Sequence, residues 1–510
     1  MTLSPLPLTP LRRRLLLVSL LTVSFLGALD HTIVSTSLST IAGELGALQQ
    51  MSWVVVSYTL AATVSLPLIG KLADSLGARR IFLASLVLFI LASVACGFAQ
   101  DMIQLTAARV VQGLSSAGLQ LMSQTIVASV TTPRERPRLL SIIGVAFPIA
   151  ILVGPVLGGV ITDTLGWHWV FWINVPLGLA ALVLAIVAIP PISGQVRGRF
   201  DVVGAVTFTI AMVALVLAVT ATVDGFGLTT IILLGLAAVA FTVFFIVEGR
   251  VEDPFVPLRL FRNRTVAAGI TLSAIIGIGL FSVVSYIPTY IQMAYRTTAT
   301  VSGLVPIATV LGMLVASLAT GFLASRSGRY RRFAIAGTSI AASGLGIMAL
   351  LPIGLPLWVP MLVMGLVGIG TGAFMSLVVA VVQSAVPREQ TGSVTATINL
   401  VRQVGATTGT AVIGAVIGIG ILARLPESLN PSTLTPELVR GLSLELQTEV
   451  AGVYGAVMAP VFAALALTYA VGIVAAILLP SGRLSDEQPP AHPSEPDSES
   501  PVIEPQNQAA

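Results

Sequence analysis

The amino-acid sequence predicts an all-α membrane protein that crosses the bilayer many times. Of its 510 residues, 55% are hydrophobic and only 9% are charged, whereas soluble domains carry roughly 25% charged residues. Apolar segments recur along the chain between short loops that contain charged residues, Gly or Pro. Since a transmembrane helix needs about 20 apolar residues, these segments predict fourteen transmembrane helices.

The fourteen segments follow one another over most of the chain. We place them near residues 15–36, 52–70, 81–98, 103–126, 138–160, 167–189, 201–221, 229–248, 266–288, 301–323, 333–352, 357–380, 393–422 and 456–480. Arg12, Arg13 and Arg14 before the first segment are also typical of a signal peptide. We interpret the first segment as a membrane helix, because it is longer than the apolar region of a signal peptide and many more segments follow it.

Basic residues are distributed unevenly between the two sides of the predicted membrane helices. Of the 26 Lys and Arg residues, 21 fall in the termini and the even-numbered loops, and only Arg296, Arg424 and Arg440 fall on the other side. The positive-inside rule therefore predicts cytoplasmic termini, in the inner (plasma) membrane. The basic residues behind the net charge of +4 are thus explained by membrane orientation, so we expect no nucleic-acid partner. The remaining two, Arg109 and Arg402, lie inside spans.

Two segments lie outside the predicted bundle. Residues 424–454 form an extracytoplasmic loop, in which Thr435 and Pro436 are typical of the start of a short helix. After Leu484 the chain is rich in Pro, Ser and acidic residues, which predicts a disordered cytoplasmic tail.

Several classes of site are excluded by the sequence. The single cysteine, Cys96, excludes an internal disulfide and a site of several cysteines around a metal, and we interpret it as a small apolar filler. No phosphate-binding Gly-Lys-Ser/Thr loop is present, which argues against ATP-driven transport. We expect no cofactor, with a proton gradient as the energy source.

Two cytoplasmic loops repeat one pattern. Gly70 and Gly77 lie seven positions apart and precede Arg79 and Arg80, and residues 321–332 repeat this spacing after the tenth span. The matched positions predict two six-helix bundles, residues 15–189 and 266–480, joined by two linker helices and loops in residues 190–265, with residues 1–14 and 481–510 as cytoplasmic ends. Internal repeats of six spans are typical of secondary transporters, whose substrate site lies near the membrane midplane between the repeats.

Several motifs resemble those of the major facilitator superfamily. They are the loop from Gly70 through Asp74 and Gly77 to Arg79 and Arg80, the R-x-x-Q-G pattern from Arg109 through Gln112 to Gly113, and the antiporter signature Gly154, Pro155, Gly158 and Gly159. Residues 29–34 around Asp30, the Trp-rich residues 167–176, Phe200-Asp201, Pro288 with Tyr290 and Gln292, and Arg402-Gln403-Val404-Gly405 resemble the fourteen-span drug:proton antiporters of the DHA2 family. The resemblance spans residues 15 to about 480 and implies the major facilitator fold, with helices arranged as 6 + 2 + 6.

The sequence departs from the family pattern at a few positions. In the second repeated loop Ser325 replaces the acid that Asp74 supplies in the first, so only the first loop has an acid for a gate contact. The resemblance implies that this loop braces the two halves in the outward-facing state. The alternative is that Asp74 is a solvated loop acid. Ala150 also replaces a common Gly ahead of Gly154.

Asp30 is the acid that lies deepest inside a predicted span. An ionised carboxylate at the centre of a membrane helix costs about 2.5 to 3.5 kcal/mol on insertion scales, so it needs a partner or a water-filled cavity. At about 1.5 Å per residue, Asp30 and Arg109 both come out about 8 to 9 Å below the outer edge of a hydrocarbon core about 30 Å thick. We hypothesise that Asp30 exchanges protons and that Arg109 tunes its pKa, on which burial and the cation act in opposite senses. The alternative is a static ion pair that fixes helix packing.

Other polar residues inside the spans are weaker candidates. We expect Tyr58, Gln112, Gln292, Asn399, Arg402 and Gln403 near the cavity. Arg402 either lines the cavity or bonds backbone carbonyls, and its neighbours Asn399 and Gln403 favour a polar face. For His31 we favour packing or gating over proton transfer, because adjacent helical residues point about 100° apart.

For the remaining motif residues, a purely structural role is an alternative to a functional role. The segment Gly154 to Gly159 either packs closely against another helix or kinks its own, and an antiport role is the alternative. His168, Trp167, Trp169 and Trp172 are interpreted as an interfacial belt.

These observations favour a proton-coupled secondary exporter of hydrophobic, often cationic drugs, dyes or biocides. Its partners would be a small hydrophobic substrate, protons and the lipid bilayer. The alternatives are an exporter of an endogenous lipid, siderophore or metabolite, and a non-transporting receptor or scaffold. The presence of Asp30, Arg109 and the signature loops argues against a scaffold. Substrate identity, proton stoichiometry and oligomeric state stay open.

Overall fold

The protein is a bundle of long α-helices. The computed structural model describes residues 9–45, 53–192, 201–221, 227–251, 258–426, 429, 436–481 and 483–484. The predictions for most of the tail, and for the loop residues between these ranges, lie outside the described residues. Within them, thirteen helices are long and apolar enough to cross a membrane.

The first half of the chain forms the helices that carry Asp30 and Arg109. They are α1 (Pro10–Ile33), η1 (Val34–Thr36), α2 (Leu38–Glu44), α3 (Trp53–Leu76), α4 (Ala78–Gly97), α5 (Met102–Val130), α6 (Arg136–Gly144), α7 (Ala146–Leu165), α8 (His168–Trp172) and α9 (Asn174–Ala188). The helix pairs α6–α7 and α8–α9 each continue across a single intervening residue, so each pair forms one candidate span.

The second half follows two linker helices. The elements are α10 (Val202–Ala221), α11 (Leu228–Glu248), η4 (Leu258–Arg262), α12 (Arg264–Ala294), α13 (Ala299–Ser302), α14 (Leu304–Ser327), α15 (Arg331–Leu350), α16 (Trp358–Ser384), η5 (Arg388–Gln390), α17 (Thr391–Leu422), α18 (Pro436–Gly441) and α19 (Leu444–Leu478). The short helix α18 begins at Pro436, as predicted.

Each predicted span coincides with a helix, but one helix is more polar than the others. The fourth span corresponds to α5, which has 29 residues yet is not among the thirteen apolar helices. It contains Arg109 and four glutamines, and Arg109 and Gln112 are buried. Because α5 packs against α3 and α4, Arg109 and Gln112 face protein rather than lipid. The total of fourteen membrane crossings stays a prediction.

The second glycine of each repeated loop has a positive φ. Gly77 links α3 to α4 with φ 93°, and Gly328 follows α14 with φ 69°. Side chains with a Cβ rarely adopt positive φ, so glycine is favoured at both positions. Each turn sends the chain directly into the next helix, which explains why this pattern recurs.

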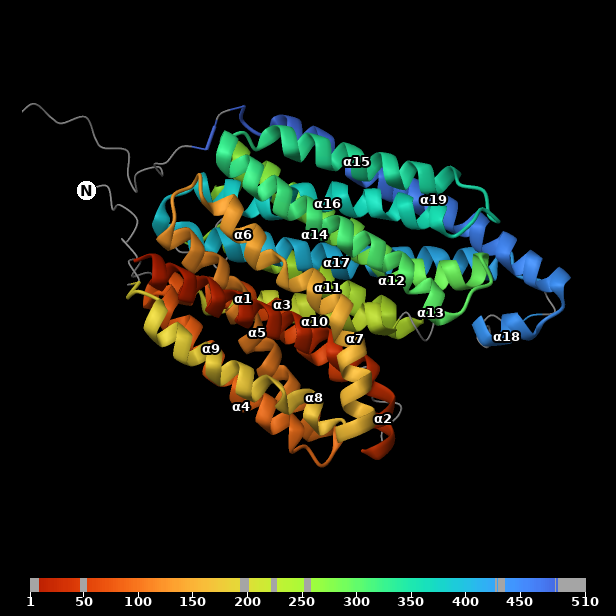
Figure 1. The fold of residues 1–510 in the computed structure, drawn as a ribbon, viewed down its shortest axis with the longest axis horizontal. Helices are drawn as coiled ribbons and strands as arrows, with labels where there is room; N and C mark the ends of the chain where they lie inside the picture. The colour runs from red at the N-terminus through yellow and green to blue at the C-terminus, as the bar shows by residue number, and fades with distance from the viewer. Residues whose placement is uncertain are drawn as a thin grey trace, which may run out of the picture.

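The helices run roughly side by side in two groups (Figure 1). The linker helices α10 and α11 pack on each other, and α10 contacts α3 and α17. In the first group α1 packs on α7 and α9, and α5 on α3 and α4; in the second α12 packs on α17 and α19, and α14 on α16. The groups meet where α17 contacts α3 and where α14 and α16 contact α6. The domain boundaries predicted above stay predictions.

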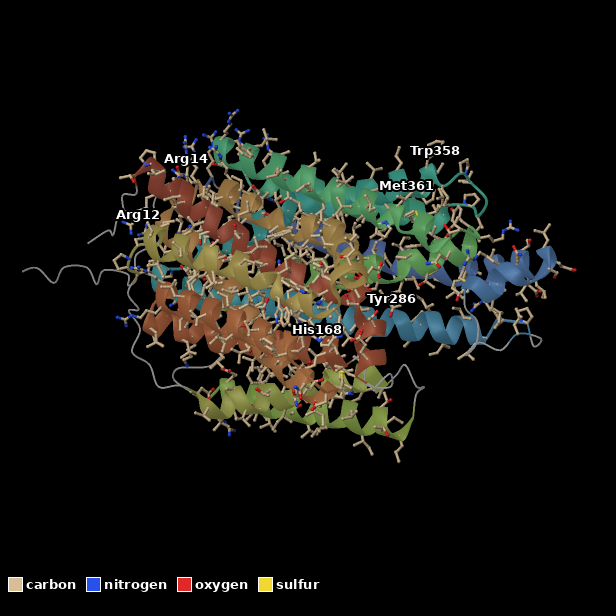
Figure 2. All side chains as sticks on the ribbon, turned by 60° about the horizontal axis from the view of Figure 1, so that its bottom comes forward. Arg12, Arg14, His168, Tyr286, Trp358 and Met361 are labelled. Atoms are coloured by element: carbon tan, nitrogen blue, oxygen red, sulfur yellow. The ribbon has the colours of Figure 1, made fainter. Side chains whose placement is uncertain are left out.

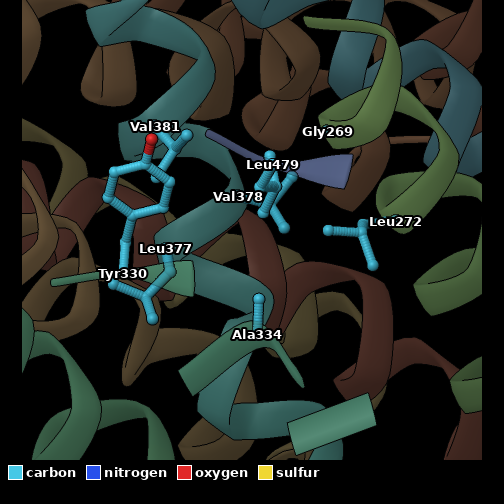
Figure 3. Close-up of a pocket in the computed structure, with 8 residues that line it drawn as sticks. All are labelled: Gly269, Leu272, Tyr330, Ala334, Leu377, Val378, Val381 and Leu479. Carbon is cyan, nitrogen blue, oxygen red and sulfur yellow. The ribbon is translucent and has the colours of Figure 1, made fainter. Parts of the chain in front are cut away.

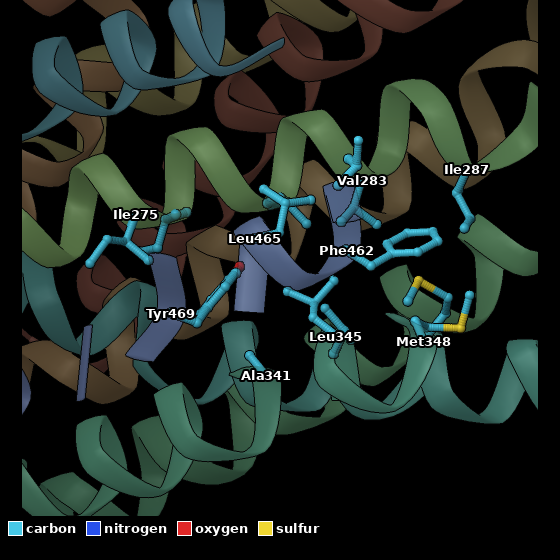
Figure 4. Packing of buried hydrophobic residues seen from close by; sticks show 14 of the residues in the cluster. Ile275, Val283, Ile287, Ala341, Leu345, Met348, Phe462, Leu465 and Tyr469 are labelled. Carbon is cyan, nitrogen blue, oxygen red and sulfur yellow. The ribbon is translucent and has the colours of Figure 1, made fainter. Parts of the chain in front are cut away.

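We call the end of the bundle that holds the repeated loops the basic end. Arg12 and Arg14 lie there, whereas Trp358 and Met361 lie toward the opposite end (Figure 2). One buried apolar cluster lies within the second half, whereas a second cluster joins the helices of the first half to α12, α16 and α17. In the second half Leu345, Phe462 and Tyr469 interdigitate between α12, α15 and α19 (Figure 4). Such close packing keeps a half nearly rigid.

Two predictions about the opposite end need correction. Residues 444–454, which were expected in a loop, are helical, because Ser443 caps α19 by accepting the N–H of Leu446 (3.4 Å). The first turns of α19 are polar, so hydropathy alone does not predict that they are helical. Trp167 is buried rather than part of a surface belt, since its indole donates to Glu44 (2.8 Å), whereas Trp169 is 45% exposed.

Candidate functional site

Asp30 on α1 and Arg109 on α5 form a buried ion pair. The guanidinium NH1 lies 2.6 Å from Oδ2 of Asp30, and the two side chains are 1% and 0% exposed. Breaking such a pair by removing one partner leaves a buried charge uncompensated, at a cost of about 3 to 5 kcal/mol. The depth estimate from the sequence therefore corresponds to a direct contact in the structure.

The second carboxylate oxygen of Asp30 is also bonded. Gln112 and Asn174 donate their side-chain amides to Oδ1 at 2.8 and 2.9 Å. Both amides also lie within hydrogen-bond distance of the Ser93 hydroxyl. Three donors from α5 and α9 thus hold the carboxylate, and no side of Asp30 faces open space.

Arg109 is held from several directions. Its Nε donates to the backbone carbonyl of Val54 (3.2 Å) and its NH1 also donates to Gln112 (2.8 Å). The guanidinium carbon lies 4.2 Å from the ring centre of Tyr58, and 5.8 Å from that of Phe171. Cation–π contacts of this kind stabilise a desolvated arginine by roughly 2 kcal/mol.

The sequence of α5 explains this geometry. Arg109, Gln112 and Ser116 follow at helical spacing, so they share the face turned toward α1 and α3. Ser116 is 2.7 Å from the Tyr58 hydroxyl. A Cβ at Gly113 would collide with the Tyr58 carbonyl, so only glycine lets the two helices approach this closely. Tyr58 and Gln112 therefore belong to the sealed network, not to the open cavity wall that we expected.

His31 follows Asp30 but has a different environment. Its side chain is exposed, whereas Asp30 is fully buried. The imidazole lies 5.8 Å from the Tyr58 ring, centre to centre. Solvent-accessible space thus reaches within one residue of the ion pair.

The antiporter motif packs against the helix that carries Asp30. A Cβ at Gly154 would collide with Thr32, and one at Gly158 with the Ile33 carbonyl. Gly159 faces open space, with no atom within 4 Å of such a Cβ. Although Pro155 lies inside the motif, α7 runs from Ala146 to Leu165 without interruption. The structure thus shows close helix packing at this motif.

Asp74 connects the two halves at the basic end. Ser393, in the first turn of α17, donates its hydroxyl and its backbone N–H (3.1 Å) to Oδ2 of Asp74. A carboxylate at a helix N-terminus is favoured by the helix dipole. A Cβ on the neighbouring Gly70 would lie 2.6 Å from that of Ala396, so α3 and α17 touch here.

Arg79 and Arg80 of the first loop make no hydrogen bond to the other half among the described residues. Arg79 donates to the carbonyl of Ile186 (2.9 Å) within the first half, and Arg80 is exposed. Arg134 joins the halves instead, since it donates to the carbonyls of Ser325 (3.2 Å) and Arg326 (3.0 Å). Backbone oxygens of the second loop thus accept these bonds where an acidic side chain is missing.

A third polar contact joins the halves nearer mid-depth. Asn399 on α17 donates to the side chain of Gln124 on α5 (2.9 Å), and Gln383 donates to its carbonyl (3.3 Å). Arg402 is 9% exposed and donates to the Asn399 oxygen. One alternative for Arg402 was that it bonds backbone carbonyls. Among the described residues its side chain makes no such bond.

Two remaining candidates make fewer contacts. Gln292 on α12 and Gln403 on α17 are both half-buried, and neither hydrogen-bonds to another described residue. The sequence did not predict Asn174 and Ser93 in the network around Asp30, or Gln124 in the contact between the halves. Asn174 was detectable as a lone amide within an apolar span, but its partner was not.

A small pocket lies away from this network. It lies between α12, α15, α16 and the end of α19 (Figure 3). Leu272, Val378 and Leu479 line it with other apolar side chains, and Tyr330 supplies its polar atom. It lacks the convergent polar groups of a specific site. No cluster of three metal-ligating side chains occurs among the described residues.

Comparison with known proteins agrees with this architecture. The family model of the Major Facilitator Superfamily matches residues 20–410. An uncharacterised transporter from Mycobacterium tuberculosis is 33% identical over 489 residues, which cover 94% of this chain and 71% of the relative. Multidrug transporter protein MdtP from Bacillus subtilis is 30% identical over 430 residues, covering 82% of this chain and 78% of the relative.

A solved structure has a similar fold. The proton:xylose symporter XylE superposes with a TM-score of 0.59 at 13% sequence identity, covering 93% of this chain and 97% of that chain. At this identity the similarity concerns the fold alone.

Proposed function

Since this chain belongs to the Major Facilitator Superfamily and is therefore a membrane transporter rather than an enzyme, we propose that it exports hydrophobic compounds in exchange for protons. The drugs, dyes and biocides implied by the resemblance to the drug:proton antiporters are the proposed substrates. Two relatives of about 30% identity are named a multidrug transporter and a multidrug resistance protein, which supports this choice. A proton gradient would supply the energy, without a cofactor.

The buried Asp30–Arg109 pair carries the proposal. Both charges are sealed from solvent in this conformation, and no other acid lies as deep within the helices of the first half. A group that must bind and release a proton in turn needs such an environment, because a small movement of the cation changes its proton affinity strongly. Protonation of Asp30 would weaken the ion pair and release α5 from α1.

The contacts between the halves suggest how this local change is linked to transport. Hydrogen bonds between the halves, among the described residues, lie at the basic end or near mid-depth, as with Asp74 and Ser393 or Asn399 and Gln124. If the basic end is cytoplasmic, as the positive-inside rule predicts, this is an outward-facing form in the plasma membrane. Protonation from outside would then favour return to the inward-facing form, and proton release inside would complete the cycle.

The experiment is to replace Asp30 by Asn in the full chain and reconstitute it in liposomes. We expect the variant to assemble but to lose proton movement driven by a panel of hydrophobic drugs and dyes. Asp163→Asn is the matched control, because Asp163 is an exposed acid at the opposite end. A folded Asp30→Asn protein that couples protons normally would disprove the role of Asp30. Net substrate efflux without any proton movement in the unaltered protein would disprove antiport.

A further inference from the structure

Arg402 is a buried cation that lacks an acidic partner. Its side chain is 9% exposed, and neither of the two ion pairs among the described residues includes it. Its hydrogen bond goes to the neutral oxygen of Asn399. A charge inside the membrane normally pairs with an opposite charge or faces water.

The surrounding helices cannot supply that opposite charge. Among the helices that pack on α17, the sequences of α5, α10, α12 and α16 contain neither Asp nor Glu, and nor does α17 itself. In α3 the acid Asp74 is bonded to Ser393, nine residues before Arg402. In α19 the acids Glu445 and Glu449 lie in the first two turns, at the opposite end of the bundle. In the first half, Asp30 is fully buried and bonded to Arg109, Gln112 and Asn174.

The rest of the guanidinium is accessible to solvent. Arg402 donates one bond, to Asn399, so its other nitrogens make none to the described residues. Some buried nitrogen atoms have neither a hydrogen-bond partner nor contact with solvent, but no nitrogen of Arg402 is one of these. An arginine presents five N–H donors in a planar fork, which matches a carboxylate, sulfonate or phosphate. Donors therefore remain for a ligand.

The position of Arg402 fits a substrate site. It lies eleven residues beyond the start of α17, about 16 Å along the helix, and thus near the middle of a hydrocarbon core about 30 Å thick. It lies one helical turn beyond Asn399, whose bond to Gln124 joins the halves. Substrate sites of secondary transporters lie near the midplane between the repeats.

We infer that Arg402 binds the anionic head group of an amphiphilic acid, so that this transporter carries hydrophobic acids. The inference rests on the proposed function and narrows its substrate class. A cationic substrate would meet no acid on the helix segments around Arg402, and Asp30 is not free to receive it. An acid would neutralise Arg402 while its apolar body contacts the uncharged helices around it.

The test uses three probes of similar shape and different charge: 1-naphthylacetate, 1-naphthylacetamide and 1-naphthylethylammonium. Binding and counterflow are measured at pH 7 without a proton gradient, with the full chain in phosphatidylcholine liposomes. We expect the acid to bind about tenfold more tightly than the amide, or about 1.4 kcal/mol, and the ammonium compound most weakly. Equal binding of acid and amide, or no binding of the acid, would overturn the inference.

Two variants connect the preference to this residue. Arg402→Gln should remove the preference for the acid and leave amide binding nearly unchanged, whereas Arg402→Lys should retain part of it. Arg424→Gln is the control, because it removes an exposed cation just beyond the same helix. If Arg402→Gln keeps the preference, the inference fails. If it does not fold, Arg402→Lys and the three probes on the unaltered protein decide instead.

Two further results separate this inference from its alternatives. Competition by phosphatidylglycerol added to the liposomes would support an anion site and identify a lipid as its occupant. Binding and counterflow need no proton gradient, so they test this inference by itself. A preference for the acid together with net export of the acid that moves no protons would retain this inference and contradict proton coupling.

Discussion

The two halves of the transporter each bury an arginine deep within a span, in opposite electrostatic settings. In the first half Arg109 is 1% exposed and lies 2.6 Å from Asp30. In the second half Arg402 is 9% exposed and bonds a neutral amide. In the first arrangement the two charges neutralise each other and are buried, so only protonation can change the net charge. In the second arrangement the cation has no acidic partner among the described residues, so it can bind an anionic ligand.

The largest expected effect is a difference in the free energy of unfolding between variants of the two arginines. Arg109→Met should lower the free energy of unfolding by about 3 to 5 kcal/mol, because it leaves Asp30 buried without its cation. Arg402→Met should cost only about 1 kcal/mol, since a single hydrogen bond is lost and no charge is stranded. Unfolding of the purified proteins in detergent measures both. Equal losses would show that the two settings do not differ.

A double variant checks the cause. Adding Asp30→Asn to Arg109→Met removes the stranded carboxylate and should restore most of the lost stability. If the double variant is as unstable as Arg109→Met, packing rather than charge explains the loss.

The next effect tests the packing that encloses the first arrangement. Gly158→Ala should destabilise the protein by about 1 to 3 kcal/mol, because the new methyl group collides with α1 near Ile33. Gly159→Ala is the matched control within the motif, where the structure leaves space. Thermal unfolding compares the two. A harmless Gly158→Ala would show that α1 moves easily, which would weaken the description of Asp30 as sealed.

The smallest effect concerns the contact that joins the halves. Asp74→Asn keeps the shape but loses the charge at the N-terminus of α17, which should weaken closure of the basic end by about 1 kcal/mol, or about fivefold. Spin labels at exposed Ser75 and Ser327, with Cys96 replaced by Ser, would report a larger fraction of separated halves.

Arg134→Gln is the comparison for the second loop. It removes the donor to the Ser325 and Arg326 carbonyls at an exposed site, so its effect should be smaller. A larger effect than that of Asp74→Asn would mean that the second loop dominates closure.

The fold was predictable because long apolar segments leave few choices. The predicted spans coincide with helices, and the glycine repeat corresponds to two turns of positive φ at Gly77 and Gly328. The start of α19 at Leu444 was not predictable from hydropathy, since its first turns are polar.

The site was predictable only in part. Depth along a helix brings Asp30 and Arg109 to one level, but it does not specify which faces meet. The bonds from Asn174 and Ser93 depend on how α9 and α4 rotate against α1 and α5, which no local pattern reports. For the same reason the sequence could not show that Tyr58 and Gln112 are sealed while His31 is exposed.

The missing acid beside Arg402 also bears on how membrane voltage acts on transport. Moving one elementary charge through 100 mV is worth about 2.3 kcal/mol. Exchange of a monovalent cation for one proton moves no net charge and would not respond to voltage. Export of an acid anion against an entering proton moves two charges in the same sense, or about 4.6 kcal/mol at 100 mV. With such a substrate the cycle generates current, and an inside-negative membrane would drive export even without a pH difference.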